Sequence, residues 1–491
     1  MDLLKEEKVK QSHQIERVEP GSFEHHQHWY PKAHNAMLHP MVQFFLQLDN
    51  RLIIDRYCHL HPMVKPGRLK ELLQYKPAYY PWSGADLINV TNARGKKQMV
   101  VIESNSCPSG QKSMPLVQEN AEQGGYRQLM EHSFSPYCKI KKHAKPGTLA
   151  VLYDKNLMEN GGYASAMADY FQCPVYLVPC FEQEGNPFTR VKGNYLEILT
   201  DDREWRKVNA AFRYVTQKPW NRLPMSTKTR IYNPIVACLA GGRNKLVASK
   251  AYEAFNHSFK RYGLKIRTPV TIHDVAKDEI PGWVKKLGGQ AVIKVPYSNA
   301  GQGVYTIVNE AELHAFMLSD QEYTQFIVQS LIGNYKWSST TSTGKFFHLG
   351  TIPNSKGETF VFDLRMMICS TPEGFRPLSV YSRRAEKPLV NELHSGDASW
   401  DILGTNLSHK TSTGDWTTDT HRLIMMDRRD FNKLGLGVDD LIEAFIQTVM
   451  ANIAIDKMAI RLMDGKGRFR RKLFSTLNDD PVLMDQILRQ T

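Results

Sequence analysis

The sequence predicts an α/β fold with α+β lobes, and three observations support this. The chain has 491 residues, of which 42% are hydrophobic, enough for two to four domain-sized units. A strand–helix–strand pattern over residues 148–178 is typical of a parallel α/β unit. Apolar runs separated by turn residues, at 85–102 and 360–381, predict two antiparallel hairpins.

The first hairpin ends in polar residues that suit a cation. Its predicted strands are residues 85–90 and 98–102, and the second strand continues through Glu103 and Asn105 into a Pro-Ser-Gly turn. Side chains two apart on a strand share a face, and the hairpin would place Asp86 beside Glu103. Such oxygen ligands can hold Mg²⁺ together with substrate phosphates. The alternative is a strand whose polar end caps a turn.

The parallel unit follows a boundary at Pro146-Gly147. Residues 148–153 are predicted to form a buried strand, 163–172 a helix and 174–178 a second strand. A helix between two strands is the usual connection when the strands run parallel. We therefore expect a separate α/β domain in this part of the chain.

A glycine-containing segment follows a later strand, residues 291–294, that ends in Lys294. Glycines in the loop 298–304 let backbone N–H groups approach a polyanion, and Lys294 adds a point charge. The segment is not a Walker loop, because Gly-Lys-Ser/Thr is absent. It also lacks the third glycine and the following helix of the dinucleotide fingerprint. An ordinary turn is the alternative.

Composition excludes several classes of protein. No run of 18 or more apolar residues is present, so no membrane span is expected, and the start of the chain lacks the apolar region of a signal peptide. Seven cysteines without CxxC pairs fit reduced thiols. The net charge is +13, but its densest run, residues 466–472, comes with no nucleic-acid-binding signature. We expect a cytoplasmic protein that binds no membrane and no nucleic acid.

These segments together resemble the ATP-grasp family. The Asp86 hairpin with its Glu-x-Asn and Pro-Ser-Gly turn is similar to the family's magnesium-binding end, and Lys294 with the glycine loop is similar to its flexible phosphate loop. The resemblance implies metal ligands Asp86, Glu103 and Asn105 for Mg²⁺, with Mn²⁺ as an alternative. It also implies that the following residues bind ATP: Lys250, Lys294, Ser298, Asn299, Ala300, Gly301, Gln302, Gly303, Val304, Val328, Gln329, Ser330 and Leu331.

Two of these assignments depend on segments that resemble named parts of the family. Lys250 would be the second ATP lysine, on a helix that precedes Gly263. Backbone groups from Val328 to Leu331 would read the adenine edge in the strand that joins the two lobes. The family commonly has an acidic residue at this joint, where the chain has Gln329, so the ribose contact stays unassigned.

The second lobe is implied by two arginine-bearing strands. Arg365, and Arg384 in the sequence Ser-Arg-Arg-Ala, resemble residues that hold a carboxylate or a transferring phosphate by bidentate contacts. We assign both as catalytic, although the neighbouring Arg383 is an equal candidate for the position of Arg384. A surface ion pair is the alternative for either one.

The order of the segments is unusual for this family. Metal-binding strands normally follow the arginine strands, and residues 458–463 and 472–478 have a similar hairpin-like pattern there. However, Arg461 and Ser475 or Thr476 occupy the ligand positions, which removes the negative charge that Mg²⁺ needs. The N-terminal hairpin is therefore favoured, and the order resembles the circularly permuted ATP-grasp proteins, which include glutathionylspermidine-synthetase-like ligases.

The resemblance divides the chain into four regions. Residues 1–145 would carry the metal-binding strands and 146–245 a pre-ATP-grasp parallel α/β domain. Residues 246–335 would form the lobe with the nucleotide lysines and glycine loop, and 336–491 the second lobe with a helical extension.

The implied reaction joins a carboxylate to an amine through an acyl-phosphate, at the cost of ATP. Its partners would be a small-molecule or peptide acid and an amine. The sequence leaves the oligomeric state open, with a homo-oligomer as one option. A phosphotransferase on the same fold and a non-catalytic protein that binds ATP or a polyanion are the competing functions.

Overall fold

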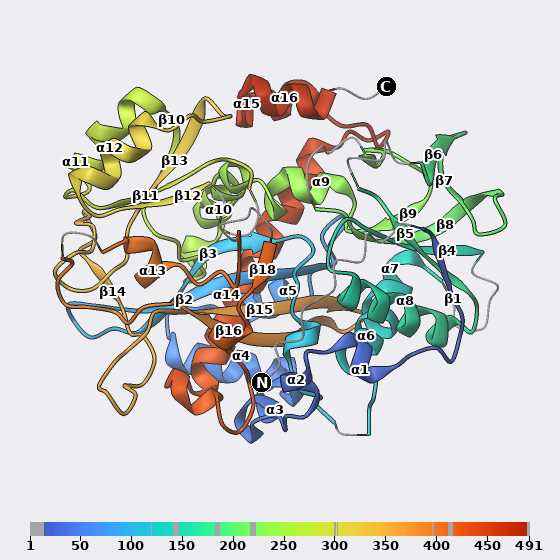
Figure 1. Cartoon of the computed structure of the whole chain (residues 1–491), viewed down its shortest axis with the longest axis horizontal. Helices are drawn as coiled ribbons and strands as arrows, with labels where there is room; N and C mark the ends of the chain where they lie inside the picture. Colours follow the sequence, from blue (N-terminus) through green and yellow to red (C-terminus); the bar gives the residue numbers. More distant parts are fainter. Residues whose placement is uncertain are drawn as a thin grey trace.

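The computed structural model describes most of the chain. The described residues are 14–118, 120–140, 147–181, 187–216, 222–298, 301, 303–394, 397–410 and 416–488. Within them the strands form one seven-stranded, one six-stranded, one four-stranded and one two-stranded sheet, with helices packed around them (Figure 1). The α/β class predicted from the sequence is confirmed.

The seven-stranded sheet contains the predicted parallel unit. Its order is β1-β5-β4-β8-β7-β6, with β9 also paired to β8. Strands β4 and β5 run parallel and are joined by α8, as the sequence predicts. The bounds are β1 (Glu16–Val18), β4 (Thr148–Tyr153), α8 (Leu157–Phe171), β5 (Val175–Pro179), β6 (Thr189–Lys192), β7 (Tyr195–Leu199), β8 (Trp205–Tyr214) and β9 (Arg230–Tyr232).

The six-stranded sheet brings together strands from the two ends of the chain. Its order is β14-β2-β15-β16-β19, with β3 also paired to β2. Strand β2 therefore lies between its hairpin partner β3 and β15, a strand more than 250 residues later in the sequence (Figure 1). The bounds are β2 (Trp82–Asn92), β3 (Gln98–Asn105), β14 (Phe346–His348), β15 (Phe362–Thr371), β16 (Gly374–Arg384) and β19 (Leu423–Ile424).

Both predicted hairpins form. Strands β2 and β3 pair antiparallel, as do β15 and β16. Asp86 lies directly opposite Glu103, and a bulge after this pair leaves Ile102 as the extra residue. A bulge bends the strand locally and redirects side chains, which places this acidic pair at an irregular point of the sheet.

The four-stranded sheet carries Lys294. Its order is β10-β13-β11-β12, all antiparallel, and helices α11 and α12 lie beside it in the upper left of Figure 1. Lys294 ends β11, opposite Val304 of β12. The bounds are β10 (Thr271–Ala276), α11 (Ile280–Lys286), β11 (Ala291–Lys294), β12 (Val304–Ile307), α12 (Glu310–Leu318) and β13 (Gln325–Ser330).

Helix α14 (Val438–Leu462) is the longest helix described and packs against β3, β15 and α10 (Lys245–Phe259). The strand predicted at 458–463 is wrong, because α14 continues to Leu462 and only Met463 is extended. Met458, Ala459 and Leu462 are buried at helical spacing while Ile460 is exposed, so the apolar run follows a period of 3.6. The strand expected over 472–478 is also wrong, since α15 (Arg471–Leu477) occupies these residues.

The remaining elements surround these sheets. The N-terminal helices are α1 (His25–His28), α2 (Pro31–His34), α3 (Pro40–Gln47), α4 (Asn50–Leu60) and α5 (Pro66–Leu73). The others are α6 (Gly124–Leu129), α7 (Ser135–Cys138), α9 (Ile235–Ala237), α13 (Ser399–Leu403), α16 (Pro481–Leu488), β17 (Ser408–Lys410) and β18 (Trp416–Thr418). No described helix is both long enough and apolar enough to span a bilayer.

Candidate active site

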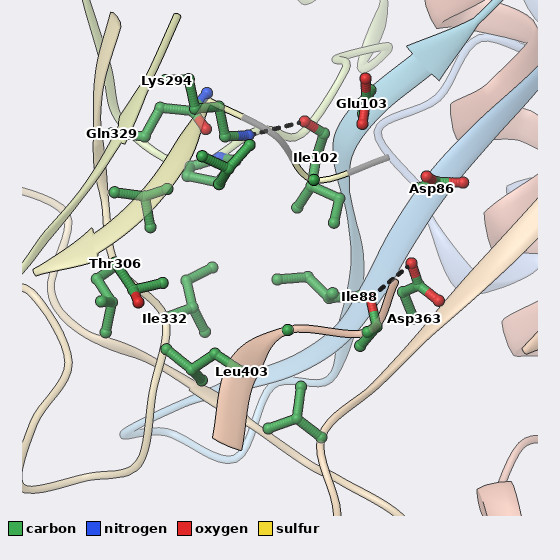
Figure 2. A pocket seen from close by; sticks show the side chains of 18 of the residues that line it. Asp86, Ile88, Ile102, Glu103, Lys294, Thr306, Gln329, Ile332, Asp363 and Leu403 are labelled. Carbon is green, nitrogen blue, oxygen red and sulfur yellow. Dashed lines mark hydrogen bonds between the residues drawn. The ribbon is translucent and has the colours of Figure 1, made fainter. Parts of the chain in front are cut away.

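A pocket lies where the four-stranded sheet faces the six-stranded sheet. Residues of β11, β12 and β13 line it from one side, and residues of β2, β3, β14, β15 and β16 from the other, with α13 closing one edge. Figure 2 shows these side chains converging from both sheets. The pocket thus depends on strands that are distant in the sequence.

One half of the pocket is apolar. Ile88 and Ile102 come from the β2–β3 hairpin, Val292 from β11, Ile332 from the segment after β13, and Leu403 from α13. In Figure 2 Ile88, Ile332 and Leu403 surround the lower part of the space. Aliphatic side chains from opposite walls form a slot that suits a flat, weakly polar group such as a nucleobase.

The other half is ionic and begins at Asp86. The Asp86 carboxylate, 3% exposed, accepts two hydrogen bonds from Arg365, from Nε at 2.6 Å and Nη2 at 2.7 Å. Nη2 of Arg383 donates a third at 2.9 Å. Burial alone would raise the pKa of Asp86, but the charges of Arg365 and Arg383 outweigh it and hold the pKa below its ordinary value. Asp86 is therefore anionic at neutral pH.

Arg383 joins Asp86 to a second buried carboxylate. Nε of Arg383 donates to Asp363 at 3.0 Å, and the two residues are opposite partners on β16 and β15. Burial raises the pKa of Asp363 although Arg383 opposes the shift. Arg384, one residue further, points to the other face of the sheet, where it donates to the Ala385 carbonyl and lies over the Phe360 ring.

Glu103 faces two lysines. Its carboxylate lies 3.4 Å from Nζ of Lys245, the first residue of α10, whose start is capped by the Asn244 side chain. Nζ of Lys294 donates to the Ile102 carbonyl at 3.1 Å (Figure 2). Burial lowers the pKa of Lys294 to about 8, and the charge of Lys245 adds to this, while Glu103 opposes it. Two cations and a carboxylate thus meet at the end of the apolar slot.

The structure does not bring Lys250 to this pocket. Its Nζ donates to Asp274 at 2.9 Å and to the Leu477 carbonyl at 2.7 Å, and the residue is absent from the pocket lining. Lys245 and Lys250 are five positions apart on α10, so they leave the helix in different directions. The lysine on α10 that enters the pocket is Lys245.

Asn105 lies outside the pocket lining as well. Its amide oxygen accepts from Nη1 of Arg243 at 3.0 Å, and its amide nitrogen is buried without a partner in the described structure. Asp86 and Glu103 both line the pocket. Among the described residues, no three His, Cys, Asp or Glu side chains form a group that could hold a metal by themselves.

The described part of the glycine loop reaches the pocket. Gly301 and Val304 line it, and Ser298 accepts from Nζ of Lys245 at 2.9 Å through its hydroxyl. Gly301 has φ +77° and Gly303 +65°, values that favour glycine. Asn299, Ala300 and Gln302, predicted to bind nucleotide, lie outside the described residues.

The joint after β13 differs in detail from the prediction. Gln329, Ser330 and Leu331 line the pocket, whereas Val328 is buried in the sheet away from it. The Ser330 amide donates to the Val270 carbonyl at 2.8 Å and the Leu331 amide to the Ser339 hydroxyl at 2.7 Å. These two donors already have protein acceptors, so adenine would have to be read by other groups.

Comparisons with known proteins give weak likenesses. No family model matches the chain, and no curated protein sequence matches it. A glutathione synthetase-like effector from Globodera pallida has TM-score 0.37 and 10% identity, covering 71% of this chain and 86% of the effector. A RimK domain ATP-grasp protein from Sphaerobacter thermophilus has TM-score 0.28 and 14% identity, covering 48% and 90%. D-alanyl-alanine synthetase A from Vibrio cholerae has TM-score 0.29 and 11% identity, covering 48% and 89%. At these scores no family is assigned.

Lys245 and His348 are pocket residues that the sequence did not single out. Lys245 follows a Gly-Gly-Arg-Asn segment. The Asn in this segment is a typical helix N-cap, and it was the one feature of the sequence that could have placed Lys245 at the start of a helix. His348 ends β14, and burial lowers its pKa to about 4 against a hydrogen bond to the Ile332 backbone, so it is neutral at pH 7. A lone histidine in an apolar segment gives no signal in the sequence.

Proposed function

We propose that the chain is an ATP-grasp-type ligase that uses ATP to join a carboxylate to an amine. One observation carries the proposal: Asp86, Glu103, Lys245 and Lys294, from three separate parts of the chain, meet at one end of an apolar slot. A slot for a base that opens onto lysines and carboxylates has the chemistry that a metal-bound nucleoside triphosphate requires.

The nucleotide would lie with its base in the apolar half and its phosphates at the ionic end. Nζ of Lys245 and of Lys294 would neutralise phosphate oxygens, as point charges without fixed geometry. Lys245 takes the role that the sequence assigned to Lys250. Its contacts with Glu103 and the Ser298 hydroxyl hold it between the hairpin and the glycine loop, where phosphates would replace part of its hydrogen bonding.

Asp86 and Glu103 are the proposed ligands of a magnesium ion that is shared with the phosphates, and Asp86 would give up part of its hydrogen bonding with Arg365 and Arg383 to bind it. Mg²⁺ in nucleotide sites usually takes one or two carboxylates together with phosphate oxygens and water. Asp86 stays anionic because of its arginine partners, and its opposite residue Glu103 lies on the same wall of the pocket. When bound, the ion would offset the charge that develops as the γ-phosphoryl group leaves. Asn105 would need to release Arg243 to join them.

Arg365 and Arg383 are the proposed catalytic arginines. Both lie on the strands predicted to carry them, and both have guanidinium groups at Asp86. Arg383 lines the pocket, Arg365 contacts Asp86 from outside the lining, and Arg384 points away. A guanidinium there would stabilise the acyl-phosphate or the tetrahedral oxyanion formed when the amine attacks. The hydroxyl of Tyr381 lies within 3.2 Å of Nη1 of Arg365 and helps to fix its orientation.

The strand order supports a circular permutation. The acidic β2–β3 hairpin comes first in the sequence, yet β2 pairs with the arginine strand β15. Helices α14 and α15 occupy the residues of the alternative C-terminal hairpin. Of the two segments considered for the metal-binding strands, only the N-terminal one is a hairpin in the described structure. A glutathionylspermidine-synthetase-like ligase has this order, and we propose it as the nearest functional class.

The glycine loop would exclude water from the reaction. Acyl-phosphates hydrolyse readily, so a lid that closes over the phosphates serves both binding and chemistry. Gly301 already touches the far wall, since a Cβ placed there would overlap the Asn406 amide and approach the Trp400 ring. Any larger residue at 301 would hold the loop off that wall.

The test is product analysis with ATP, mixed amino acids and small amines. Release of ADP and phosphate only when an acid and an amine are both present supports ligation. A phosphorylated acceptor would support the phosphotransferase alternative. Tight ATP binding without turnover under all mixtures would contradict the ligase assignment and leave a binding protein.

A further inference from the structure

A second, larger cavity lies at the other end of the six-stranded sheet. It has a volume of about 730 Å³ and is bordered by Pro81 before β2, Thr371 at the end of β15, the segment 224–229 before β9, and α7. Eight residues separate Asp363 in the nucleotide pocket from Thr371, which is roughly 26 Å along an extended strand. We call this cavity the basic groove.

The side chains that line the basic groove carry a net positive charge, and the nearby Asp456 carboxylate lies behind the wall, where it accepts from the amides of Ala78 and Tyr79. The lining of the groove includes Lys76, Lys139, Lys228 and Arg230, and no Asp or Glu is among the described residues that line it. Lys76 is held by the Thr371 carbonyl, to which its Nζ donates at 2.8 Å, and Arg230 is held by the Cys138 carbonyl. Lys139 and Lys228 are exposed, so four cations from three segments of the chain border this cavity.

The densest basic run of the sequence borders the same groove. Met463 and Gly467 line it, so the turn at the start of this run touches the groove. Within this run Arg468 is paired with Asp464: Nε of Arg468 and the amides of Lys466 and Arg468 all donate to the Asp464 carboxylate.

The walls of the groove suit a polypeptide better than a nucleic acid. Single-stranded nucleic acids stack successive bases on exposed aromatic rings. Only Tyr79 and Tyr137 are aromatic among the described lining residues, and the Tyr137 hydroxyl is tied to the Ala78 carbonyl. The rest of the wall is proline, methionine, isoleucine and small polar residues, which can take the aliphatic stems of glutamate side chains.

We propose that the basic groove binds an acidic polypeptide segment. The carboxylates would pair with Lys76, Lys139, Lys228 and Arg230, the four basic residues that line the groove. A volume of about 730 Å³ falls within the ~300–1,000 Å³ typical of ligand pockets. The site is separate from the nucleotide pocket, and the proposal does not depend on the ligase assignment.

The experiment measures binding of a fluorescent hexaglutamate peptide to the full chain by anisotropy at low salt. The double variant K139E/K228E should weaken binding at least about tenfold, because two attractive charges become repulsive. The control K70E/K356E changes the net charge equally at exposed lysines outside the groove and should change binding less than about twofold. Thermal melts verify that each variant is folded, and K139Q/K228Q should give an intermediate loss.

Three results would overturn the proposal. The first is an unmodified protein that does not bind the peptide. The second is an equal loss in both charge-reversal variants, which would mean that only the net charge attracts the peptide. The third is a single-stranded oligonucleotide that binds more tightly than the peptide and loses affinity in K139E/K228E, which would make the groove a nucleic-acid site.

Discussion

The two halves of the proposed nucleotide pocket are built on different physical principles. The apolar half offers only non-directional contacts, from Ile88, Val292, Ile332 and Leu403. Several flat groups could therefore be accommodated there. In the ionic half, Asp86 and Glu103 each contact a named cation at a definite distance. If the pocket binds ATP as proposed, the apolar half would contribute mainly to affinity, while the ionic half would position the phosphates and the cation.

This contrast has a kinetic consequence. Interactions made equally with bound substrate and transition state alter KM, whereas those made with charge that develops in the transition state alter kcat. Substitutions at the ionic end should therefore lower kcat, and substitutions in the apolar half should raise KM for ATP. Single substitutions can test each half separately.

The largest effect is expected for Glu103→Gln. The change keeps the shape but removes the negative charge that faces Lys245 and would share a cation with Asp86. We expect ATP turnover to fall at least about 10³-fold, since a lost cation ligand costs several kcal/mol of transition-state stabilisation. The measurement is the steady-state rate of ADP release.

Glu253→Gln is the matched control. Glu253 lies on α10 but is largely exposed and outside the pocket, and its carboxylate faces His273. The control should keep turnover within about twofold. If Glu103→Gln kept wild-type kcat with an unchanged melting temperature, the ionic end would not be the site of chemistry.

The next effect separates the two lysines of α10. Lys245→Met removes a cation that contacts Glu103 and Ser298, so kcat should fall about 10²-fold, as for loss of one preorganised electrostatic contact. Lys250→Met removes contacts to Asp274 and Leu477 only, so kcat should change less than about threefold. The opposite ranking in ADP release would return the phosphate role to Lys250.

These lysines show what the sequence could predict and what it could not. The opposition of Asp86 and Glu103 follows from a short turn and a period of two, and Lys294 ends the strand on which it was predicted. Those are local patterns. Lys245 instead depends on α10 packing beside β3, a contact between residues about 140 positions apart that leaves no local pattern.

Strand register and helix length were the other features that the sequence alone could not predict. Arg383 and Arg384 are adjacent, and only the pairing of β15 with β16 decides which one shares a face with Asp363. The apolar run at 458–463 suits either a strand or a buried helix, and packing of α14 against the sheets decides it. In both cases the deciding interaction is tertiary.

A pH profile gives a third effect. Because the pKa of Lys294 is lowered to about 8, its side chain is charged below that pH and neutral above it. Its electrostatic attraction for phosphates is therefore present at pH 7 and lost as the pH rises. We expect kcat/KM for ATP to fall up to about tenfold between pH 8 and 9. Lys294→Arg keeps the charge at every pH and should move this fall upward. An identical profile for wild type and Lys294→Arg would assign the titration to another group.

The smallest effect should come from the apolar half. Ile332, 6% exposed, forms part of the slot between the sheets, and Ile332→Ala shortens the side chain that forms its wall. Loss of apolar contact with a bound base is worth roughly 1 kcal/mol, so KM for ATP should rise about fivefold. Since the base is bound equally before and during reaction, kcat should stay within about twofold.

Leu349→Ala controls for this change, because Leu349 is 38% exposed and lies outside the pocket lining, so neither constant should move. A drop in kcat for Ile332→Ala, with KM unchanged, would mean that the apolar wall also positions the phosphates. The apolar half would then affect catalysis as well as binding. It would have to be treated as one unit with Asp86, Glu103 and the two lysines.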